Sequence, residues 1–251
     1  LLTRLFKLAG IDQAAVKAYQ VYELEKSIAE HHWTRVKNRD RIKTYNKVSL
    51  NELCTLLPNF QWNDYLDISD ISQVSHVIVR QPSYLKSLND VLKNASPASW
   101  KAYYQARLLT DAAPYLSDDF FQASFDFYSK KLGGQEEPEP RDKRAVNLVN
   151  GILGEIVGKE YVKRHFPPQA KERMLDLVGN LRKAMADSID NLEWMDDATK
   201  AEAHKKLEKF TTKIGYPDKW KDYSELQIDP TDLIGNLRRA SEHVHNREVA
   251  K

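Results

Sequence analysis

The chain has 251 residues, 41% of them hydrophobic, and its 38 Lys and Arg against 36 Asp and Glu leave a net charge of +2. A chain of this length buries a substantial core as one large domain or two small ones, and its near-neutral charge excludes a general attraction to nucleic acid or anionic membranes. No run approaches the roughly 18 apolar residues of a membrane-spanning helix, so we expect no membrane contact from this segment.

The first predicted element is the end of a helix over residues 1–10, since Arg4 and Lys7 interrupt the apolar residues and exclude a signal peptide. A second helix is predicted after Asp12, which is a candidate N-cap. Its apolar stripe consists of Ala18, Val21, Tyr22, Ile28 and Ala29. Glu25 lies inside this stripe and is interpreted as a rim or paired structural carboxylate rather than as a buried functional acid.

The densest basic stretch follows, and it is the only feature that favours nucleic-acid binding. It comprises Arg35, Lys37, Arg39, Arg41 and Lys43. Asp40 interrupts it, and no aromatic residue that would stack on bases is interleaved. The pattern is therefore typical of a solvated loop face, and no nucleic-acid partner is predicted.

Ser49 and Glu52 form a Ser-x-x-Glu capping box, which predicts a short helix that stops by Pro58. Within it, Cys54 is the only cysteine of the chain, so an intrachain disulfide is excluded. Because this thiol is flanked by leucines, we expect it to be a buried small hydrophobe rather than a nucleophile.

One strand is predicted over residues 74–79, whose sequence VSHVIV is rich in β-branched residues and is closed by Pro82. Two helices then begin at Ser96-Pro97 and at Ser117, the second ending at Gly133-Gly134. Both carry aromatic and aliphatic residues at helical spacing, which favours a core role over stacking on a ligand. They are Trp100, Tyr103, Tyr104, Leu108 and Leu109 in one, and Phe121, Phe125, Tyr128 and Leu132 in the other.

The segment QEEPEPR, residues 135–141, is the one stretch with the composition of a linker. It divides the chain near its middle. A boundary between two domains and an exposed loop within one domain both fit this composition.

Beyond this segment, Gly151, Gly154 and Gly158 accompany an apolar stripe formed by Val146, Val149, Leu153, Ile156 and Val157. Because a glycine inside a helix costs about 1 kcal/mol relative to alanine, three together predict a face against which another backbone packs closely. The spacing is not a dinucleotide-binding fingerprint, since no strand precedes it.

Three further helices are predicted: one from Pro167-Pro168, one capped by Asp196 or Asp197, and one from Asp229-Pro230 with Asp232 in its first turn. The first helix has the longest apolar stripe at steps of three and four, formed by Met174, Leu177, Val178, Leu181, Ala184, Met185, Ser188 and Leu192. The second helix is expected to stop at Gly215 and Pro217, and its predicted buried edge consists of Ala203, Leu207, Phe210 and Ile214. The predicted fold class is therefore mainly α, with one or more multi-helix domains and at most a small β element near residues 74–79.

No catalytic, cofactor-binding or metal-binding residue is predicted. A catalytic zinc helix would carry His-Glu-x-x-His, and this motif is absent from the sequence. The seven histidines are His31, His32, His76, His165, His204, His243 and His245. His31 and His32 diverge on a helix, as do His243 and His245, although the latter pair would share a face on an extended segment; neither pair has a further His or Cys at ligand spacing. A surface hydrogen bond between His204 and Glu208 is expected, and no nucleophile elbow or Walker-type loop is present.

Several passages nevertheless resemble the neprilysin and endothelin-converting-enzyme family of zinc metallopeptidases. They are YNKVSLNELCTLLPNFQWNDYL (45–66), VIVRQPSYLKSL (77–88), WKAYYQARLL (100–109) and NLEWMDDATKAEAHKKLEKFTTKIGYPDKWKDYSEL (191–226). RDKRAVNLV (141–149) has Ala145 where animal members carry a cysteine. The sequence is therefore most similar to the bacterial branch, which includes oligopeptidases of the PepO type.

The resemblance implies that residues 1–251 are part of the N-terminal helical region, the lid or chamber, of a zinc endopeptidase. In this family the zinc ligands lie in a later His-Glu-x-x-His helix, so we expect zinc in the full-length enzyme and none in this segment. The implied partners are peptide substrates and the catalytic domain of the same chain. The family favours a secreted, periplasmic or membrane-anchored location, with a cytoplasmic one as the alternative.

Two functional hypotheses follow. In the first, the chain is a non-catalytic portion of a zinc oligopeptidase, inactive alone, that helps to restrict substrate size. In the second, it is a helical binding or scaffold protein derived from the same family without peptidase activity. A His-Glu-x-x-His motif in the complete gene decides for the first hypothesis.

Overall fold

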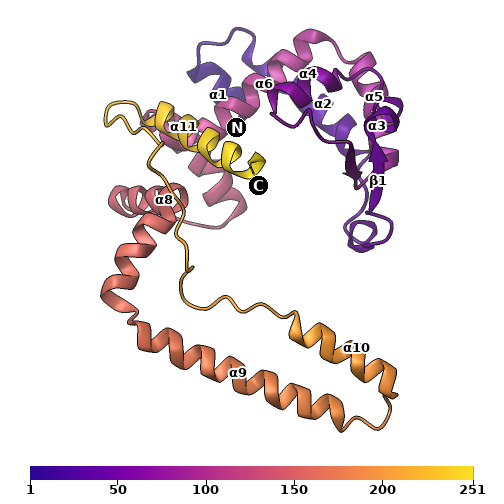
Figure 1. Cartoon of the computed structure of the whole chain (residues 1–251). Coiled ribbons are helices and arrows are strands. Elements are labelled where there is room, and N and C mark those ends of the chain that lie inside the picture. Colours follow the sequence, from indigo (N-terminus) through magenta and orange to yellow (C-terminus); the bar gives the residue numbers. More distant parts are fainter. Residues whose placement is uncertain (251) are drawn as a thin grey trace. The chain divides into compact units, whose positions relative to one another are not determined.

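The mainly α prediction is confirmed by a computed structural model, which describes residues 1–250. Within these residues, eleven α-helices accompany one two-stranded antiparallel sheet (Figure 1). The chain forms two compact units. The first unit comprises residues 1–138 and the chain from Asp229 onward, and the second unit comprises Glu139–Ile228.

The core of the first unit lies where α1 (Leu2–Leu8), α2 (Ala14–Ala29) and α6 (Pro97–Ala112) pack together. Phe6 and Val21 are fully buried there. They pack against the small side chains of Ala14, Ala102 and Ala106. Because alanines leave room on the surface of a helix, the phenyl ring of Phe6 fills the space between the three helices.

The prediction that Asp12 caps α2 is wrong. Gln13 is the residue that precedes the helix, in a left-handed conformation with φ 56°, and no side chain caps the helix. The apolar stripe is also shifted: Val21 and Leu24 are buried, whereas Tyr22 is 58% exposed. Glu25 is exposed, in agreement with a rim position.

The predicted strand is confirmed as β2 (His76–Val79), and its partner is β1 (Asn46–Ser49). In the antiparallel register Asn46 lies opposite Val79 and Ser49 lies opposite His76. The basic residues between Arg35 and Lys43 are all exposed, as a solvated loop face requires.

The capping box at the start of α3 (Leu50–Leu56) is confirmed. The Glu52 amide donates to Ser49 Oγ at 3.3 Å, and the Ser49 amide donates to Glu52 Oε2 at 2.7 Å. The second of these hydrogen bonds lowers the pKa of the Glu52 carboxyl. The stabilisation by this hydrogen bond is therefore fully present above the ordinary glutamate pKa, and it is lost as pH falls through the lowered pKa of Glu52.

Replacing Ser49 by alanine is expected to destabilise the first unit by about 1 kcal/mol, because the Glu52 amide loses its acceptor. Urea denaturation of the chain measures this change. Thr55→Ala is the control, since Thr55 also lies on α3 and bonds only the carbonyl of Asn51 one turn earlier. An equal loss for both variants would contradict a specific role of the cap.

The expectation that Cys54 is buried is wrong, because its thiol is exposed. Leu53 is the buried residue of α3, with 3% of its surface accessible. Successive residues of an α-helix point about 100° apart, so the inward position of Leu53 turns Cys54 toward solvent.

The aromatic stripes of the next two helices are only partly core. On α6 the buried residues are Ala102 and Ala106, while Tyr104 and Leu108 are 65% and 71% exposed. The helix that follows Ser117 begins as α7 (Asp118–Ser124) and continues as a π-helix, η3 (Phe125–Leu132), before ending at Gly133. The wider π-helical turn rotates the stripe, so Phe125 is buried but Leu132 is 65% exposed.

The remaining elements of the first unit are helical. They are η1 (Lys37–Arg39), α4 (Trp62–Ile68), α5 (Pro82–Asn94), η2 (Ala113–Tyr115) and α11 (Leu233–Val249).

The second unit consists of α8 (Arg141–His165), α9 (Pro168–Asp190), α10 (Asp197–Glu208) and the irregular segment 209–228. Helix α10 folds back beside the end of α9 (Figure 1). Arg182 Nη2 on α9 donates to the Leu207 carbonyl on α10 at 3.0 Å. The predicted buried edge of α10 is partly wrong, because the helix ends at Glu208. Phe210, beyond that end, is 64% exposed.

The glycine-rich face of α8 does not contact another backbone. A Cβ atom added to Gly151 or Gly154 would meet nothing within 4 Å, and one added to Gly158 would meet only the Trp220 ring, at 3.7 Å. Instead, α8 is kinked at Leu153, whose φ of −115° and ψ of 29° are not helical. Neighbouring glycines are a recognised cause of such kinks.

None of the helices over residues 1–250 combines the length and the apolarity that crossing a lipid bilayer requires.

Candidate functional site

The histidines with described contacts each have a different partner. His204 Nε2 lies 2.7 Å from Asp190 Oδ1 on α9, so the expected bond to Glu208 is wrong; the return of α10 along α9 brings Asp190 closer. His245 Nε2 lies 3.1 Å from the Ser69 carbonyl oxygen. Further contacts join His32 to the Tyr84 ring, His165 to the Tyr161 ring, and His76 to the Ser75 hydroxyl.

No three or more His, Cys, Asp or Glu side chains among residues 1–250 lie close enough together to hold a metal ion. The described residues therefore do not fit a zinc site, which requires three or four such ligands. The expectation that this chain binds no zinc stays a prediction, and metal analysis of the purified chain tests it.

A cavity of about 360 Å³ lies in the first unit between α3, α4, β2 and α5. Its wall is mainly apolar and includes Trp62, Tyr65 and Tyr84, with Arg80 among the few polar residues. Burial raises the pKa of the Tyr84 hydroxyl, which agrees with an apolar surrounding. The sequence analysis identified no cavity here, because its wall combines residues from four elements.

A polar and aromatic cluster holds the irregular segment of the second unit against the start of α9. Lys171 Nζ donates to the Tyr216 carbonyl at 3.0 Å and to Asp218 Oδ1 at 2.7 Å, and it lies 4.3 Å from the centre of the Tyr216 ring. The Tyr216 ring stacks on Trp220 and meets Phe166 edge-on. The hydrogen bond from Lys171 lowers the pKa of the Asp218 carboxyl.

Part of the passage 191–226, which carries the family resemblance, contributes to this cluster. Gly215, Tyr216 and Asp218 belong to residues 191–226, whereas Lys171 and Phe166 lie outside the quoted passages. The segment at 215–220 therefore has a structural role: it anchors irregular chain to a helix.

Replacing Lys171 by methionine is expected to release this segment, because the apolar stem remains while both hydrogen bonds and the cation–π contact are lost. The change removes about 1–2 kcal/mol, most of it from the bond to the backbone carbonyl, since Asp218 is exposed and adds little. Limited proteolysis within residues 209–228 measures the effect, as cleavage about 5–10-fold faster. Lys183→Met is the control on the same helix, and equal acceleration in both variants would refute the anchor.

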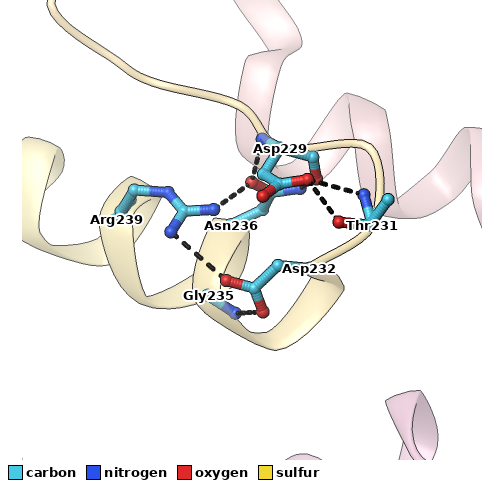
Figure 2. A network of polar contacts seen from close by, with 6 residues as sticks. All are labelled: Asp229, Thr231, Asp232, Gly235, Asn236 and Arg239. Atoms are coloured by element: carbon cyan, nitrogen blue, oxygen red, sulfur yellow. Dashed lines mark hydrogen bonds and ion pairs between the residues drawn. The ribbon is translucent and has the colours of Figure 1, made fainter.

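A second polar network fixes the start of α11, where the chain re-enters the first unit (Figure 2). Asp232 Oδ1 accepts from the Gly235 amide at 2.8 Å, and its Oδ2 lies 3.3 Å from Arg239 Nη1. The Asp229 amide donates to Asn236 Oδ1, and Asp229 Oδ1 accepts from both the amide and the hydroxyl of Thr231. All these bonds lie within residues 229–239, so the network is a helix-capping structure.

Large apolar side chains are exposed along the second unit. On α9 the exposed fractions are 42% for Met174, 51% for Leu177, 61% for Leu181 and 54% for Met185. On α8 they include Val146, Val149, Ile156 and Val157. Among residues 1–250 the structure thus presents anchoring clusters, a cavity and apolar faces.

Comparison with known proteins identifies one family. The model of Peptidase family M13 matches residues 1–217. Among curated proteins, a neutral endopeptidase of Lactobacillus helveticus is 31% identical over 229 residues, which cover 90% of this chain and 35% of the relative. Neprilysin-2 of Drosophila melanogaster is 28% identical over 245 residues, which cover 88% of this chain and 32% of the relative.

Solved structures of a zinc metalloprotease also match this chain. The zinc metalloprotease 1 of Mycobacterium tuberculosis in its open state is 38% identical, with a TM-score of 0.87, and the match covers 99% of this chain and 39% of that protein. The same metalloprotease in complex with an inhibitor matches with a TM-score of 0.88 at 36% identity, over 99% of this chain and 38% of that one. Against the curated relatives, the chain spans about a third of their length.

Proposed function

The chain belongs to Peptidase family M13, and from this membership we propose that it is a non-catalytic helical portion of a zinc-dependent metalloendopeptidase. In this proposal residues 1–251 form part of the N-terminal helical region, whose helices contribute to a chamber that restricts the size of substrates. The zinc would be held by residues outside this chain, since residues 1–250 offer no fitting ligand group.

The observation that carries the proposal is the match over nearly the whole chain. The relatives are described as a neutral endopeptidase and as a zinc metalloprotease, and the alignment with the latter covers 99% of this chain. The predicted bacterial branch is in keeping with the bacterial sources of both. Since the match covers only 39% of the metalloprotease, the remaining polypeptide is expected to supply the catalytic groups.

The experiment compares the 251-residue chain with the complete gene product. We expect the complete protein to hold one zinc and to cleave short peptides until a chelator removes the metal. The isolated chain is expected to hold no stoichiometric zinc and to cleave nothing. A complete protein that neither binds zinc nor cleaves peptides would favour the alternative, a helical binding or scaffold protein of the same family.

The chamber role needs a separate measurement, because peptidase activity alone does not test it. We expect the complete enzyme to hydrolyse a short unstructured peptide much faster than the same sequence placed in an exposed loop of a folded protein. Equal rates for the two substrates would contradict size restriction and leave the assignment as a peptidase intact.

The family favours a secreted, periplasmic or membrane-anchored location for the complete protein over a cytoplasmic one. Cell fractionation distinguishes these locations.

A further inference from the structure

The second unit has almost no core of its own. Among residues 139–228, Ile189 is the only residue that is buried, and α8 and α10 contain none. By contrast, both core clusters found among the described residues lie in the first unit. Small domains fold because they bury apolar surface, so helices that bury so little require another partner.

The side chains that would meet such a partner form a continuous stripe on α9. Met174, Leu177, Leu181 and Met185 follow one another at steps of three, four and four, which places them on one face of the helix. Each is exposed by 42% or more. Asp176 and Lys183 are also exposed and, from the helical repeat, lie on the opposite face.

We propose that this α9 stripe is the surface against which the remainder of the peptidase polypeptide packs. Three arguments favour the remainder of the polypeptide as the partner of this stripe. First, the metalloprotease that shares the fold at a TM-score of 0.87 is matched over only 39% of its length, so most of its chain lies outside the match. A unit without a core needs a permanent partner, which a covalently continuous chain supplies at every protein concentration. The stripe is apolar, as obligate interfaces are.

This inference rests on the proposed function only in that the complete protein contains further chain. It requires neither zinc binding nor peptidase activity. Its test must therefore measure the burial of the stripe and not catalysis.

The experiment measures thiol accessibility. In a Cys54→Ser background, which removes the exposed native thiol, Leu181→Cys and Lys183→Cys are made in both the 251-residue chain and the complete gene product. We expect Leu181→Cys to react with a thiol reagent at least about tenfold more slowly in the complete protein than in the 251-residue chain. Lys183→Cys, on the opposite face, is expected to react at the same rate in both.

A second variant tests the same stripe in case the Leu181→Cys substitution prevents folding. Met185→Cys removes a flexible side chain from the same stripe and should show the same protection if Leu181→Cys fails to fold in the complete protein. Equal, fast labelling of the stripe and control positions in the complete protein would overturn the proposal. Protection already present in the monomeric 251-residue chain would assign the cover to the chain itself, and protection that falls on dilution would assign it to a second copy; either result rejects the proposed occupant.

Peptidase activity of the complete protein is measured in parallel. If Leu181→Cys is protected but the complete protein is inactive, the docking surface is supported and the proposed peptidase function is contradicted. If the complete protein is active but Leu181→Cys is not protected, the peptidase function is supported and the docking surface is contradicted.

Discussion

Replacing Phe6 by alanine is expected to destabilise the first unit by about 3–5 kcal/mol, the range for removing a fully buried phenylalanine. Phe6 has no accessible surface and contacts Ala14, Val21, Ala102 and Ala106, which belong to two other helices. Three of these four neighbours are alanines, whose single methyl groups cannot reach into the space that the ring leaves. The cost therefore includes a cavity contribution in addition to the lost burial of the ring.

Urea denaturation of the 251-residue chain measures this loss, and hydrogen exchange assigns it to the first unit. Leu108→Ala is the matched control, because Leu108 lies on α6 beside the same core but is 71% exposed. We expect it to change the free energy of unfolding by less than about 0.5 kcal/mol. If Phe6→Ala cost no more than this control, the packing of α1, α2 and α6 would be wrong as described.

Helix starts were the most predictable features, because the signal is local. Ser49, Ser96 and Asp196 each accept a hydrogen bond from an amide in the first turn of their helix. The predicted start of the last helix at Asp229-Pro230 is too early, because α11 begins at Leu233 and Asp232 is its N-cap. A side chain at this position acts on its own neighbours, so the sequence alone carries the information. Asp12 failed because the turn that precedes α2 places Gln13, in a left-handed conformation, directly before the helix.

Burial was less predictable, because it depends on partners far along the chain. A three-and-four rhythm predicts which residues share a face but not whether another element covers that face. The α9 stripe has the clearest rhythm of the chain and is nevertheless exposed in the structure. Cys54 shows the same limit within a single turn, where the inward position of Leu53 decides the exposure of its neighbour.

The proposed function rests on family resemblance alone. The sequence contains no His-Glu-x-x-His motif. The two polar clusters described above are an anchor of the irregular segment and a helix cap. The Lys171 cluster illustrates why such features escape sequence reasoning: its ammonium and its acceptors are separated by more than forty positions, and only the fold brings them together.

Gly215 is the second position at which a large effect is expected. Gly215→Ala should destabilise the anchor at 215–220 by about 2–4 kcal/mol, for two additive reasons. Its φ of +68° is a left-handed conformation that costs an alanine about 1–2 kcal/mol. A Cβ atom there would also lie 2.7 Å from Phe166 Cε1, so the ring must move away from its edge-on contact with Tyr216.

The matched control is Gly179→Ala in α9, where a Cβ atom would meet nothing within 4 Å and the backbone is helical. It is expected to stabilise its helix by about 1 kcal/mol, so the two identical chemical changes should have opposite signs. Hydrogen exchange of peptides that cover 166–171 and 215–221 measures the effect on the anchor, and exchange of a peptide that covers Gly179 measures the effect on α9. Faster exchange in Gly215→Ala alone would confirm that this glycine is required by backbone conformation and the Phe166 contact. Unchanged exchange there would mean that the irregular segment is not held to α9 through this turn.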